Sequence, residues 1–463
     1  MKVIHENPYR LLGVYANSPA KERVANMNRL KRYMQVGKQM SFPLDLPGIM
    51  GDAARTDESI AEAKLNNDIR ISIIGLGYVG YPLYKLFSTR FDCIGLDIDN
   101  KKVQELLIVE DKHSPTNVVQ LTSSYSDISD CDVHIVAVPT PINNDNKPDL
   151  SLLKNACTDL ARVIKKGSVV VFESTVAPGT TEEICIPLLE SISNMRVNVD
   201  FVVGYSPERI NIGDQLHSIS NTSKIVSASC DTALKQVAEL YMSVITAPIV
   251  FASSIKVAEA SKMYENVQRD VLIALANEYA EYCRAEGISA LEVTECASTK
   301  WNFANVSAGL VGGHCISVDP YYLMSRAKSR DISMPLIATA RKTNERKPLR
   351  VAERIIDLVV NKGLPLDKTK VLILGFSYKP NIADVRNTKV ADIIYKLREY
   401  LGQIDCVDPL TDGEIVAEEY GILLKNISEV DMADYDIIVL GVSHAIFKPL
   451  IDKLPIITLN SLL

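Results

Sequence analysis

One cysteine in a glycine-rich stretch is the strongest candidate nucleophile of this 463-residue chain. Cys315 lies in the run GGHCISVDP at residues 312–320, and the glycines beside it favour an accessible loop over a core element. A neighbouring histidine or a lysine could stabilise its thiolate, which is the nucleophilic form of cysteine. On these residues alone, a buried cysteine in a glycine loop remains an alternative.

A GxGxxG motif, GLGYVG at residues 75–80, supplies a second chemistry. It follows a β-branched run, opens a helical stretch, and is followed about 20 residues later by Asp97 at the end of a second strand, as in dinucleotide sites. The helix N-terminus would face the phosphates, and the charge of Asp97 disfavours a 2′-phosphate, so we expect NAD. The expected contacts are Gly75, Gly77, Tyr78, Val79, Gly80 and Asp97. A glycine turn without a ligand is the alternative.

A nucleophilic cysteine and NAD in one chain suggest a four-electron oxidation. A thiol can trap an aldehyde as a thiohemiacetal, a second hydride transfer then gives a thioester, and water releases a carboxylate. Further candidates follow predicted strands, where ligands of α/β sheets gather: Thr140, Glu173 and Thr175. Lys262 and Asn266 share one face of a predicted helix because they lie four residues apart. These residues and Glu208 could equally be ordinary turn or helix residues.

The elements that must position these residues alternate between strands and helices. Strands are predicted at residues 69–74, 93–97, 133–138 and 169–172, and a second α/β pattern after residue 366 has strands at 371–375, 406–408 and 437–441. Between them, residues 254–286 predict one long helix that Ser254 can cap and Gly287 can end. Such a helix either bridges domains or subunits, or lies buried in a core. The expected class is α/β, with two Rossmann-like doubly wound domains joined by a long central helix and a helical middle domain.

Composition limits the classes of function. Apolar residues make up 47% and charged residues 23%, and the net charge of −7 argues against general binding to nucleic acid or to a membrane surface. No apolar run reaches the roughly 18 residues that a membrane helix needs, and we expect no signal peptide. The nine cysteines are odd in number and form no CxxC, so we expect no disulfide framework, no metal site and a cytoplasmic location.

Taken together, the motifs resemble those of the UDP-sugar 6-dehydrogenase family, which includes UDP-glucose and UDP-N-acetylhexosamine dehydrogenases. The similarity runs from about residue 65 to the end and includes GLGYVGYPL, VPTPI, ESTVAPGTTEE, YSPERINIGD, AEASKMYENVQRD, GLVGGHCISVDPYYL and LGFSYKPNIADVRNTK. The resemblance implies an NAD-binding domain (67–250), a central helical dimerisation domain with the cysteine loop (251–348) and a UDP-sugar-binding domain (349–463). It also implies a homodimer or a higher homo-oligomer.

The same resemblance assigns roles to single residues. It implies that Cys315 is the nucleophile, that Lys262 and Asn266 stabilise charge at the C6 oxygen, that Asp319 holds the lysine or a water, and that Glu208 serves proton transfer or thioester hydrolysis. Thr140, Glu173 and Thr175 would line the cofactor and reaction site. The expected substrate-binding residues are Arg209, Lys379 and Arg386, of which the last two would meet UDP or the sugar.

The GGHC loop is similar to the branch that acts on UDP-N-acetylhexosamines, closest to the UDP-N-acetylglucosamine 6-dehydrogenases of surface polysaccharide and capsule synthesis. UDP-N-acetylmannosamine and UDP-glucose are the alternative substrates. Two other readings stay open: a two-electron dehydrogenase or epimerase without covalent catalysis, and an inactive nucleotide-binding scaffold. Residues 1–66 precede the family pattern and read as an appended helical extension, whose NPYRLLG segment resembles the opening of J-domain-like segments but lacks their His-Pro-Asp tripeptide.

Overall fold

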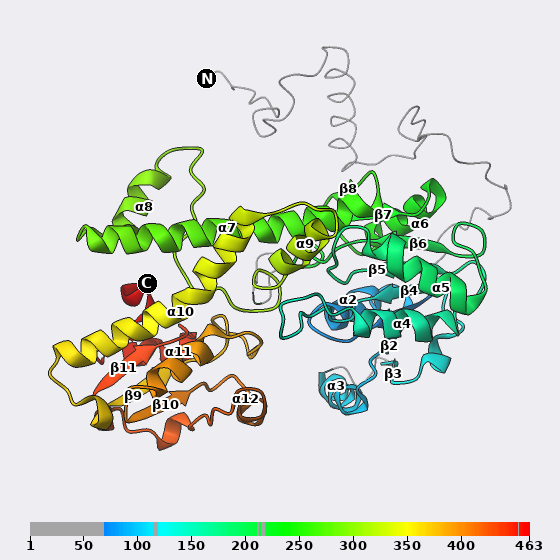
Figure 1. Cartoon of the computed structure of the whole chain (residues 1–463). Coiled ribbons are helices and arrows are strands. Elements are labelled where there is room, and N and C mark those ends of the chain that lie inside the picture. Colours follow the sequence, from blue (N-terminus) through cyan, green and yellow to red (C-terminus); the bar gives the residue numbers. More distant parts are fainter. Residues whose placement is uncertain (1–68, 114–118, 211–212, 214–217, 452) are drawn as a thin grey trace, which may run out of the picture.

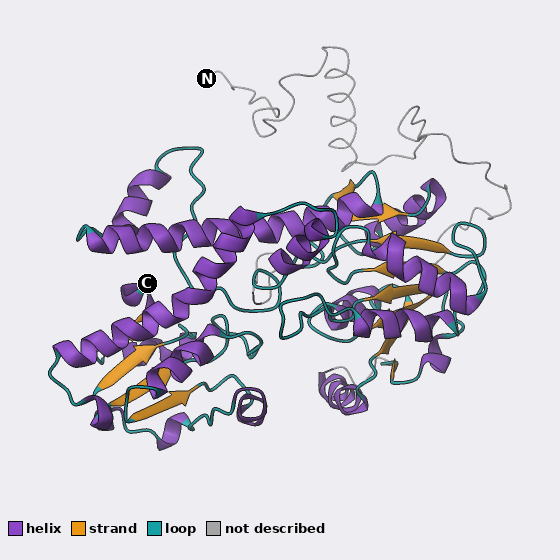
Figure 2. Cartoon of the chain, in the orientation of Figure 1, coloured by secondary structure: helices purple, strands orange, loops and turns teal. Residues whose placement is uncertain are grey.

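The protein is described by a computed structural model that covers residues 69–113, 119–210, 213, 218–451 and 453–463 (Figure 1). The predicted helical extension, residues 1–66, lies outside the described residues. Figure 2 shows two separate groups of strands, with long helices running between them. The α/β class and the two sheets that the sequence predicts are therefore confirmed.

The first sheet has eight strands in the order β3-β2-β1-β4-β5-β6-β7-β8. Neighbouring strands are parallel except β6 and β7, which pair antiparallel. Its strands are β1 (Arg70–Ile74), β2 (Asp92–Leu96), β3 (Leu121–Thr122), β4 (Val133–Val136), β5 (Val169–Phe172), β6 (Val202–Tyr205), β7 (Lys224–Ala228) and β8 (Ile249–Phe251). Its helices are α2 (Gly80–Phe87), α3 (Asn100–His113), α4 (Ser151–Ala161), α5 (Ile186–Ser193) and α6 (Asp231–Met242).

Both faces of this sheet are buried, as a parallel sheet requires. Ile71 and Ile73 of β1 pack with Phe87 of α2 and Tyr241 of α6, whereas Ile74 belongs to a second cluster with helices α4 and α5. The two faces therefore carry separate apolar cores, and the functional residues are left to the loops at the strand ends.

The middle of the chain is built on α7 (Ile255–Ala285), a helix of 31 residues. Its boundaries confirm the prediction: the Ser254 side chain accepts the N–H of Val257, and Gly287 takes φ +71° just beyond the end. The shorter helices α8 (Ala290–Ser298) and α9 (Asp319–Lys328) follow, and then α10 (Pro335–Asn361). In Figure 1, α7 extends from beside the first sheet to above the second sheet, and α10 lies between α7 and the second sheet.

The second sheet has four parallel strands in the order β10-β9-β11-β12. The strands are β9 (Lys370–Leu374), β10 (Gln403–Val407), β11 (Ile437–Leu440) and β12 (Ile457–Thr458), with helices α11 (Lys389–Arg398), α12 (Gly413–Tyr420), α13 (Lys448–Ile451) and α14 (Leu459–Leu462). Val351, Ile355 and Val359 of α10 belong to the core of this sheet. Since α10 runs through the boundary expected at 348/349, it is shared by the middle and the last domain. The domain boundaries otherwise remain predictions.

The two sheets repeat one local geometry. The backbone N–H of Gly75 donates to Leu96 O at 2.7 Å, and the N–H of Gly375 donates to Val407 O at the same distance. Both glycines have φ +91°. The sequence mirror between the two halves is thus a structural repeat. Within the described residues, no helix is long and apolar enough to cross a membrane, and no cluster of His, Cys, Asp or Glu could hold a metal ion.

Candidate active site

The three glycines of the 75–80 turn have the geometry that a dinucleotide needs. Gly75 takes φ +91°, which favours glycine over residues with a Cβ. A Cβ on Gly80 would lie 1.7 Å from the carbonyl oxygen of Gly75, so only glycine lets the helix begin this close to the strand. A Cβ on Gly77 would meet nothing within 4 Å, so the space beside its backbone is open. The turn therefore fits a pyrophosphate at the start of α2.

Asp97 follows β2 and is nearly buried. Its Oδ2 accepts the N–H of Leu76 at 2.9 Å, and its Oδ1 accepts the N–H of Asp99 at 3.1 Å. The Nζ of Lys102 also lies 2.7 Å from Oδ2, a partner that the sequence analysis missed. These contacts fix the carboxylate beside the glycine turn, where a ribose diol would meet it.

The loops after β4 and β5 are tied to each other. The hydroxyl of Thr140 donates to the carbonyl of Thr175 at 2.6 Å, and that of Ser174 donates to the carbonyl of Val138 at 2.7 Å. Glu173, by contrast, is buried: its Oε2 lies 2.5 Å from the Nζ of Lys224, and its Oε1 accepts the hydroxyl of Tyr241. Thr140 and Thr175 thus share one loop pair, whereas both carboxylate oxygens of Glu173 are paired inside the domain.

Glu208 shares the same lysine. Its Oε2 lies 3.1 Å from the Nζ of Lys224, and its Oε1 accepts the N–H groups of Arg209 and Ile210 at 2.6 and 2.8 Å. Burial alone would raise the pKa of Glu208, yet Lys224 and the two N–H groups hold it below its usual value. Burial raises the pKa of Glu173 to about 7, since Lys224 only partly opposes it and Glu208 adds to it. At neutral pH Glu208 is therefore ionised, whereas Glu173, which shares the same ammonium group, is only partly ionised.

Arg209 is turned toward α7. Its guanidinium pairs with both carboxylate oxygens of Glu265, at 3.1 Å from Nε and 2.6 Å from a terminal nitrogen, and it also donates to the carbonyl of Ser223 at 2.9 Å. The structure thus gives Arg209 a tethering contact between the NAD domain and α7. Its expected contact with substrate remains a prediction.

Lys262 and Asn266 lie on one buried face of α7, as their spacing predicts. The Asn266 amide donates to Oδ2 of Asp319, the first residue of α9, at 2.5 Å. Burial raises the pKa of Asp319 to about 6, against the opposing charge of Lys262 and the bond from Asn266. The structure therefore brings together an ammonium, an amide and a carboxylate from two helices. Glu259, one turn earlier, was missed; its carboxylate accepts the N–H groups of Gly179 and Thr181 at 2.5 and 2.9 Å.

Cys315 lies in the turn before α9 and is exposed to solvent, as predicted. Its carbonyl accepts the N–H groups of Val318 and Asp319 at 3.1 and 2.9 Å, so the cysteine and the aspartate belong to one turn. The residue is exposed, yet the protein atoms packed around its thiol exclude water from it, and this desolvation, with the charge of Asp319, raises the pKa of Cys315. Lys262 and Arg386 oppose that shift and favour the thiolate.

The last domain reaches the cysteine loop through its 376–388 segment. The guanidinium of Arg386 forms a two-point pair with Asp384, at 2.9 and 2.6 Å, and lies 4.7 Å from the ring centroid of Tyr78 in the glycine turn. The side chain of Asn387 donates to the carbonyl of Gly313 at 3.0 Å. Lys379 is half-buried in the same segment. The NAD turn, the cysteine loop and the last domain therefore meet at one junction.

A cavity of about 300 Å³ opens between the segment before the cysteine and the last domain. Its lining includes residues of the segment before the cysteine and of the 377–380 and 388–390 stretches, among them Gly309, Gly312, Tyr378 and Lys389. A wider cleft of about 1010 Å³ lies elsewhere, between α10 and the β11 side of the second sheet. Neither lining includes a predicted site residue. The smaller cavity is the better candidate for the nucleotide of a substrate because it adjoins the cysteine loop.

Known proteins share this arrangement. Three family models match the chain in order: the NAD binding domain of the UDP-glucose/GDP-mannose dehydrogenase family at residues 69–245, its central domain at 256–346 and its UDP binding domain at 372–457. The UDP-N-acetyl-D-glucosamine 6-dehydrogenase of Salmonella typhi is 41% identical over 390 residues, which cover 82% of this chain and 91% of that one. The protein of the same name from Pseudomonas aeruginosa is 41% identical over 389 residues, 82% and 92% of the two chains.

Among solved structures, the UDP-D-ManNAc dehydrogenase of Pyrococcus horikoshii superimposes with a TM-score of 0.74 at 30% identity, over 82% of this chain and 90% of that one. The order of the three matched models agrees with the first sheet, the α7 region and the second sheet. The resemblance seen in the sequence is thereby confirmed, and the chain belongs to the UDP-glucose/GDP-mannose dehydrogenase family, with NAD as its cofactor.

Proposed function

We propose that this protein oxidises the C6 hydroxymethyl group of a UDP-N-acetylhexosamine to the carboxylate, in two NAD-dependent steps through a covalent link to Cys315. The observation that carries the proposal is an accessible Cys315 in one turn with Asp319, beside Lys262 and Asn266 and next to the NAD turn. UDP-N-acetylglucosamine is the favoured substrate because two of the three relatives at 41% identity are named for it. Relatives named for UDP-N-acetyl-D-mannosamine are 29–32% identical, and that sugar is the alternative.

Bound NAD⁺ supplies the hydride acceptor, and two molecules are reduced per sugar acid formed. In the first oxidation the C6 hydroxyl loses its proton and C6 loses a hydride, which leaves an aldehyde. The Cys315 thiolate then adds to C6, and the C6 oxygen takes up a proton to give a thiohemiacetal. In the second oxidation that hydroxyl loses its proton and C6 loses its second hydride, which leaves a thioester. Water then cleaves the carbon–sulfur bond, releasing the carboxylate and the thiol. The Lys262 ammonium and the Asn266 amide stabilise negative charge on the C6 oxygen in each step, and Asp319 holds the amide in place.

Glu208 is assigned to the proton transfers or to activation of the hydrolytic water, because its carboxylate is ionised at neutral pH and can accept a proton. Lys379 and Arg386 are assigned to the diphosphate or the sugar, since cationic side chains pair well with phosphate oxygens. The cavity that lies between residues 309–312 and 377–380 would hold the nucleotide.

The test is to incubate the purified protein and NAD⁺ with UDP-N-acetylglucosamine, UDP-N-acetylmannosamine and UDP-glucose, following NADH by absorbance and products by mass. Two NADH per uronic acid are expected, with the highest kcat/KM for UDP-N-acetylglucosamine. Cys315→Ala should abolish the carboxylate, whereas Cys296→Ala, at the other exposed cysteine, should not. Carboxylate formed by the Cys315→Ala variant at the wild-type rate would refute covalent catalysis, and an aldehyde as the final product would indicate a two-electron enzyme.

The expected self-association has a structural counterpart. Large apolar side chains are exposed along α7 in a single chain. Among them, Tyr264 is 66% exposed and Leu275 is 61% exposed. We propose that this face contacts a second copy of the chain. Sedimentation of the wild type beside a Tyr264→Glu, Leu275→Glu variant tests this: the variant should sediment as a smaller species, and an unchanged distribution would contradict the proposal.

A further inference from the structure

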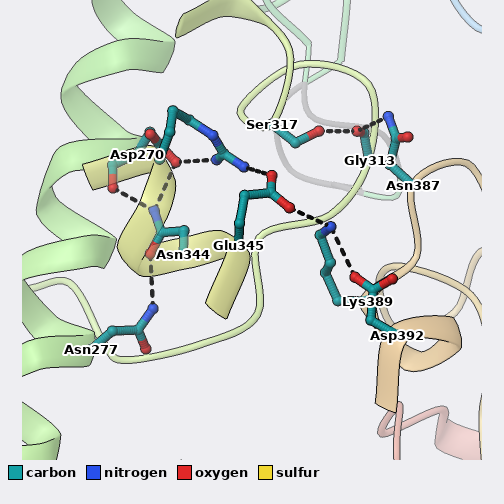
Figure 3. A network of polar contacts seen from close by, with 10 residues as sticks. Asp270, Asn277, Gly313, Ser317, Asn344, Glu345, Asn387, Lys389 and Asp392 are labelled. Carbon is teal, nitrogen blue, oxygen red and sulfur yellow. Dashed lines mark hydrogen bonds and ion pairs between the residues drawn. The ribbon is translucent and has the colours of Figure 1, made fainter. Parts of the chain in front are cut away.

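Five charged side chains of alternating sign connect three helices beside the site (Figure 3). A guanidinium nitrogen of Arg341 lies 2.6 Å from Oδ1 of Asp270 on α7, and another pairs with Glu345, also on α10. The Nζ of Lys389, the first residue of α11, lies 2.9 Å from Glu345 and 3.0 Å from Asp392. An unbroken path of ion pairs therefore joins α7 to the UDP-binding domain.

This path is costly to bury. The side chains of Asp270 and Arg341 are 0% and 2% exposed, and burial raises the pKa of Asp270 in spite of the guanidinium beside it. Ion pairs of this kind often stabilise a fold no better than apolar residues of the same volume, because desolvation offsets their attraction. In some proteins such pairs specify one alignment of the elements that carry them. The path is therefore better suited to setting the relative position of the helices than to holding the fold together.

Both ends of the path lie beside the site. Asp270 is one turn beyond Asn266 on α7, and both are buried on the same face. At the other end, Lys389 follows Arg386 and Asn387, and Asn387 donates to the carbonyl of Gly313. Lys389 also lines the cavity of about 300 Å³.

A branch of the same network forms hydrogen bonds with the segment before the cysteine, at Gly309. Asn344 donates to the carbonyl of Asp270 at 2.9 Å and accepts from the amide of Asn277 at 2.9 Å. Asn277 in turn donates to the carbonyl of Gly309 and accepts its N–H, both at 3.0 Å. The segment before Cys315 is thus held by α7 at residue 309 and by the UDP-binding domain at residue 313.

We infer that Lys389 and Glu345 are positioning residues that couple the UDP-binding domain to the cysteine loop, so that a nucleotide in the cavity restrains Cys315. A ligand in the cavity would touch both Gly309, which is bonded to α7, and Lys389, which belongs to the UDP-binding domain. The inference rests on the proposed function only in taking Cys315 as the reactive group. It needs no turnover to be tested.

The experiment measures alkylation of Cys315 by iodoacetamide, resolved by peptide mass, with and without saturating UDP. In the wild type, UDP should slow alkylation of Cys315 by about fivefold or more, while Cys296 on α8 is unaffected. In Lys389→Met, the ratio of the Cys315 alkylation rate without UDP to the rate with UDP should fall toward one. In Lys389→Arg, most of the wild-type ratio should be retained. Lys396→Met is the matched control, because Lys396 lies on the same helix but pairs with Glu399 at the surface, at 2.6 Å.

Glu345→Gln is the second variant, since Glu345 itself does not line the cavity and the variant keeps the Lys389 side chain. It should lose the coupling while its Kd for UDP, measured by calorimetry, stays within about threefold of the wild type. A wild-type ratio in Glu345→Gln, or no effect of UDP on the wild type, overturns the inference. Failure of the oxidation proposal would appear separately, as no NADH from any UDP-sugar in a protein whose thiol still responds to UDP.

Discussion

Two glycine-to-alanine changes in the NAD turn should separate packing from cofactor binding. In Gly80→Ala, the new methyl group would lie 1.7 Å from the carbonyl oxygen of Gly75, and both belong to backbone that cannot rotate away. The two groups must move apart by more than an ångström to reach normal contact. In Gly77→Ala, the methyl group meets no protein atom within 4 Å, and Gly77 is not among the glycines with positive φ.

The magnitudes follow from these distances. Overpacking of this severity costs about 1–3 kcal/mol, and each kcal/mol lowers Tm by about 2–4 °C in a domain of 150–250 residues, so Gly80→Ala should lower Tm by about 2–12 °C. Gly77→Ala should keep the apo-protein Tm within about 2 °C, because a compatible alanine costs nothing in the fold. Its methyl group does occupy the space through which a pyrophosphate approaches the backbone, so the Kd for NADH should rise by about tenfold or more.

The assay is thermal unfolding without cofactor, paired with calorimetric titration of NADH. Gly77→Ala should weaken binding at a normal Tm, and Gly80→Ala should lose both. If Gly77→Ala binds NADH like the wild type, the pyrophosphate does not pass Gly77 and our placement of the cofactor is wrong. A wild-type Tm for Gly80→Ala would show that α2 can shift away from the carbonyl of Gly75 without loss of stability, and would contradict our reasoning on packing.

Three further predictions concern charge. Lys262→Met should slow alkylation of Cys315 at about pH 8 and Asp319→Asn should speed it, because Lys262 lowers and Asp319 raises the pKa of that thiol; a shift of the same sign in both variants would contradict this. Burial raises the pKa of Glu173 from 4.5 to about 7, so the folded protein retains a proton that the unfolded chain releases, and stability falls as pH rises through that window. Glu173→Gln should therefore show a smaller loss of Tm between about pH 5 and 8 than the wild type, and equal slopes would refute the assignment. Asp97→Asn should lower the preference for NAD over NADP, measured as the ratio of their Kd values, by about tenfold, and an unchanged ratio would rule out Asp97 as the discriminating group.

Features encoded in contiguous residues were predictable from the sequence. The ends of α7 are one example, since a serine cap and a glycine beyond the last turn need no partner from elsewhere in the chain. The accessible cysteine loop and the strand before the GxGxxG turn are others. In each case the chemistry of five to ten neighbouring residues fixes the backbone, so no knowledge of the tertiary fold is required.

Contacts between distant segments were not predictable. Lys224 meets Glu173 across 51 positions, and no local pattern indicates that it also serves Glu208. It stands at the start of β7, a strand that the sequence analysis missed along with β3, β6, β8 and β12. The antiparallel pairing of β6 with β7 departs from the βαβ alternation on which the prediction relied. Asn277 and Gly309 are a similar pair, whose mutual hydrogen bonds become visible only once α7 is placed beside the loop.

The second sheet repeats the turn of the first but not its full glycine fingerprint. Gly375 keeps the turn of Gly75, and Oδ2 of Asp408 accepts the N–H of Phe376 as that of Asp97 accepts the N–H of Leu76. The second and third glycines, however, are replaced by Ser377 and Pro380.

Without those glycines the helix does not begin at the turn. It starts at Lys389 instead, nine residues beyond Pro380, and leaves a long connecting segment. The carboxylate of Asp408 is also occupied by His444, whose Nε2 lies 3.1 Å away, while Nδ1 of His444 accepts the N–H of Asn381. The segment between Pro380 and Lys389 thus forms a loop that hydrogen bonds fix in place. Within it, Arg386 contacts the glycine turn and Asn387 contacts the cysteine loop. Where the second half departs from the fingerprint, its connecting segment therefore contacts both the glycine turn and the cysteine loop.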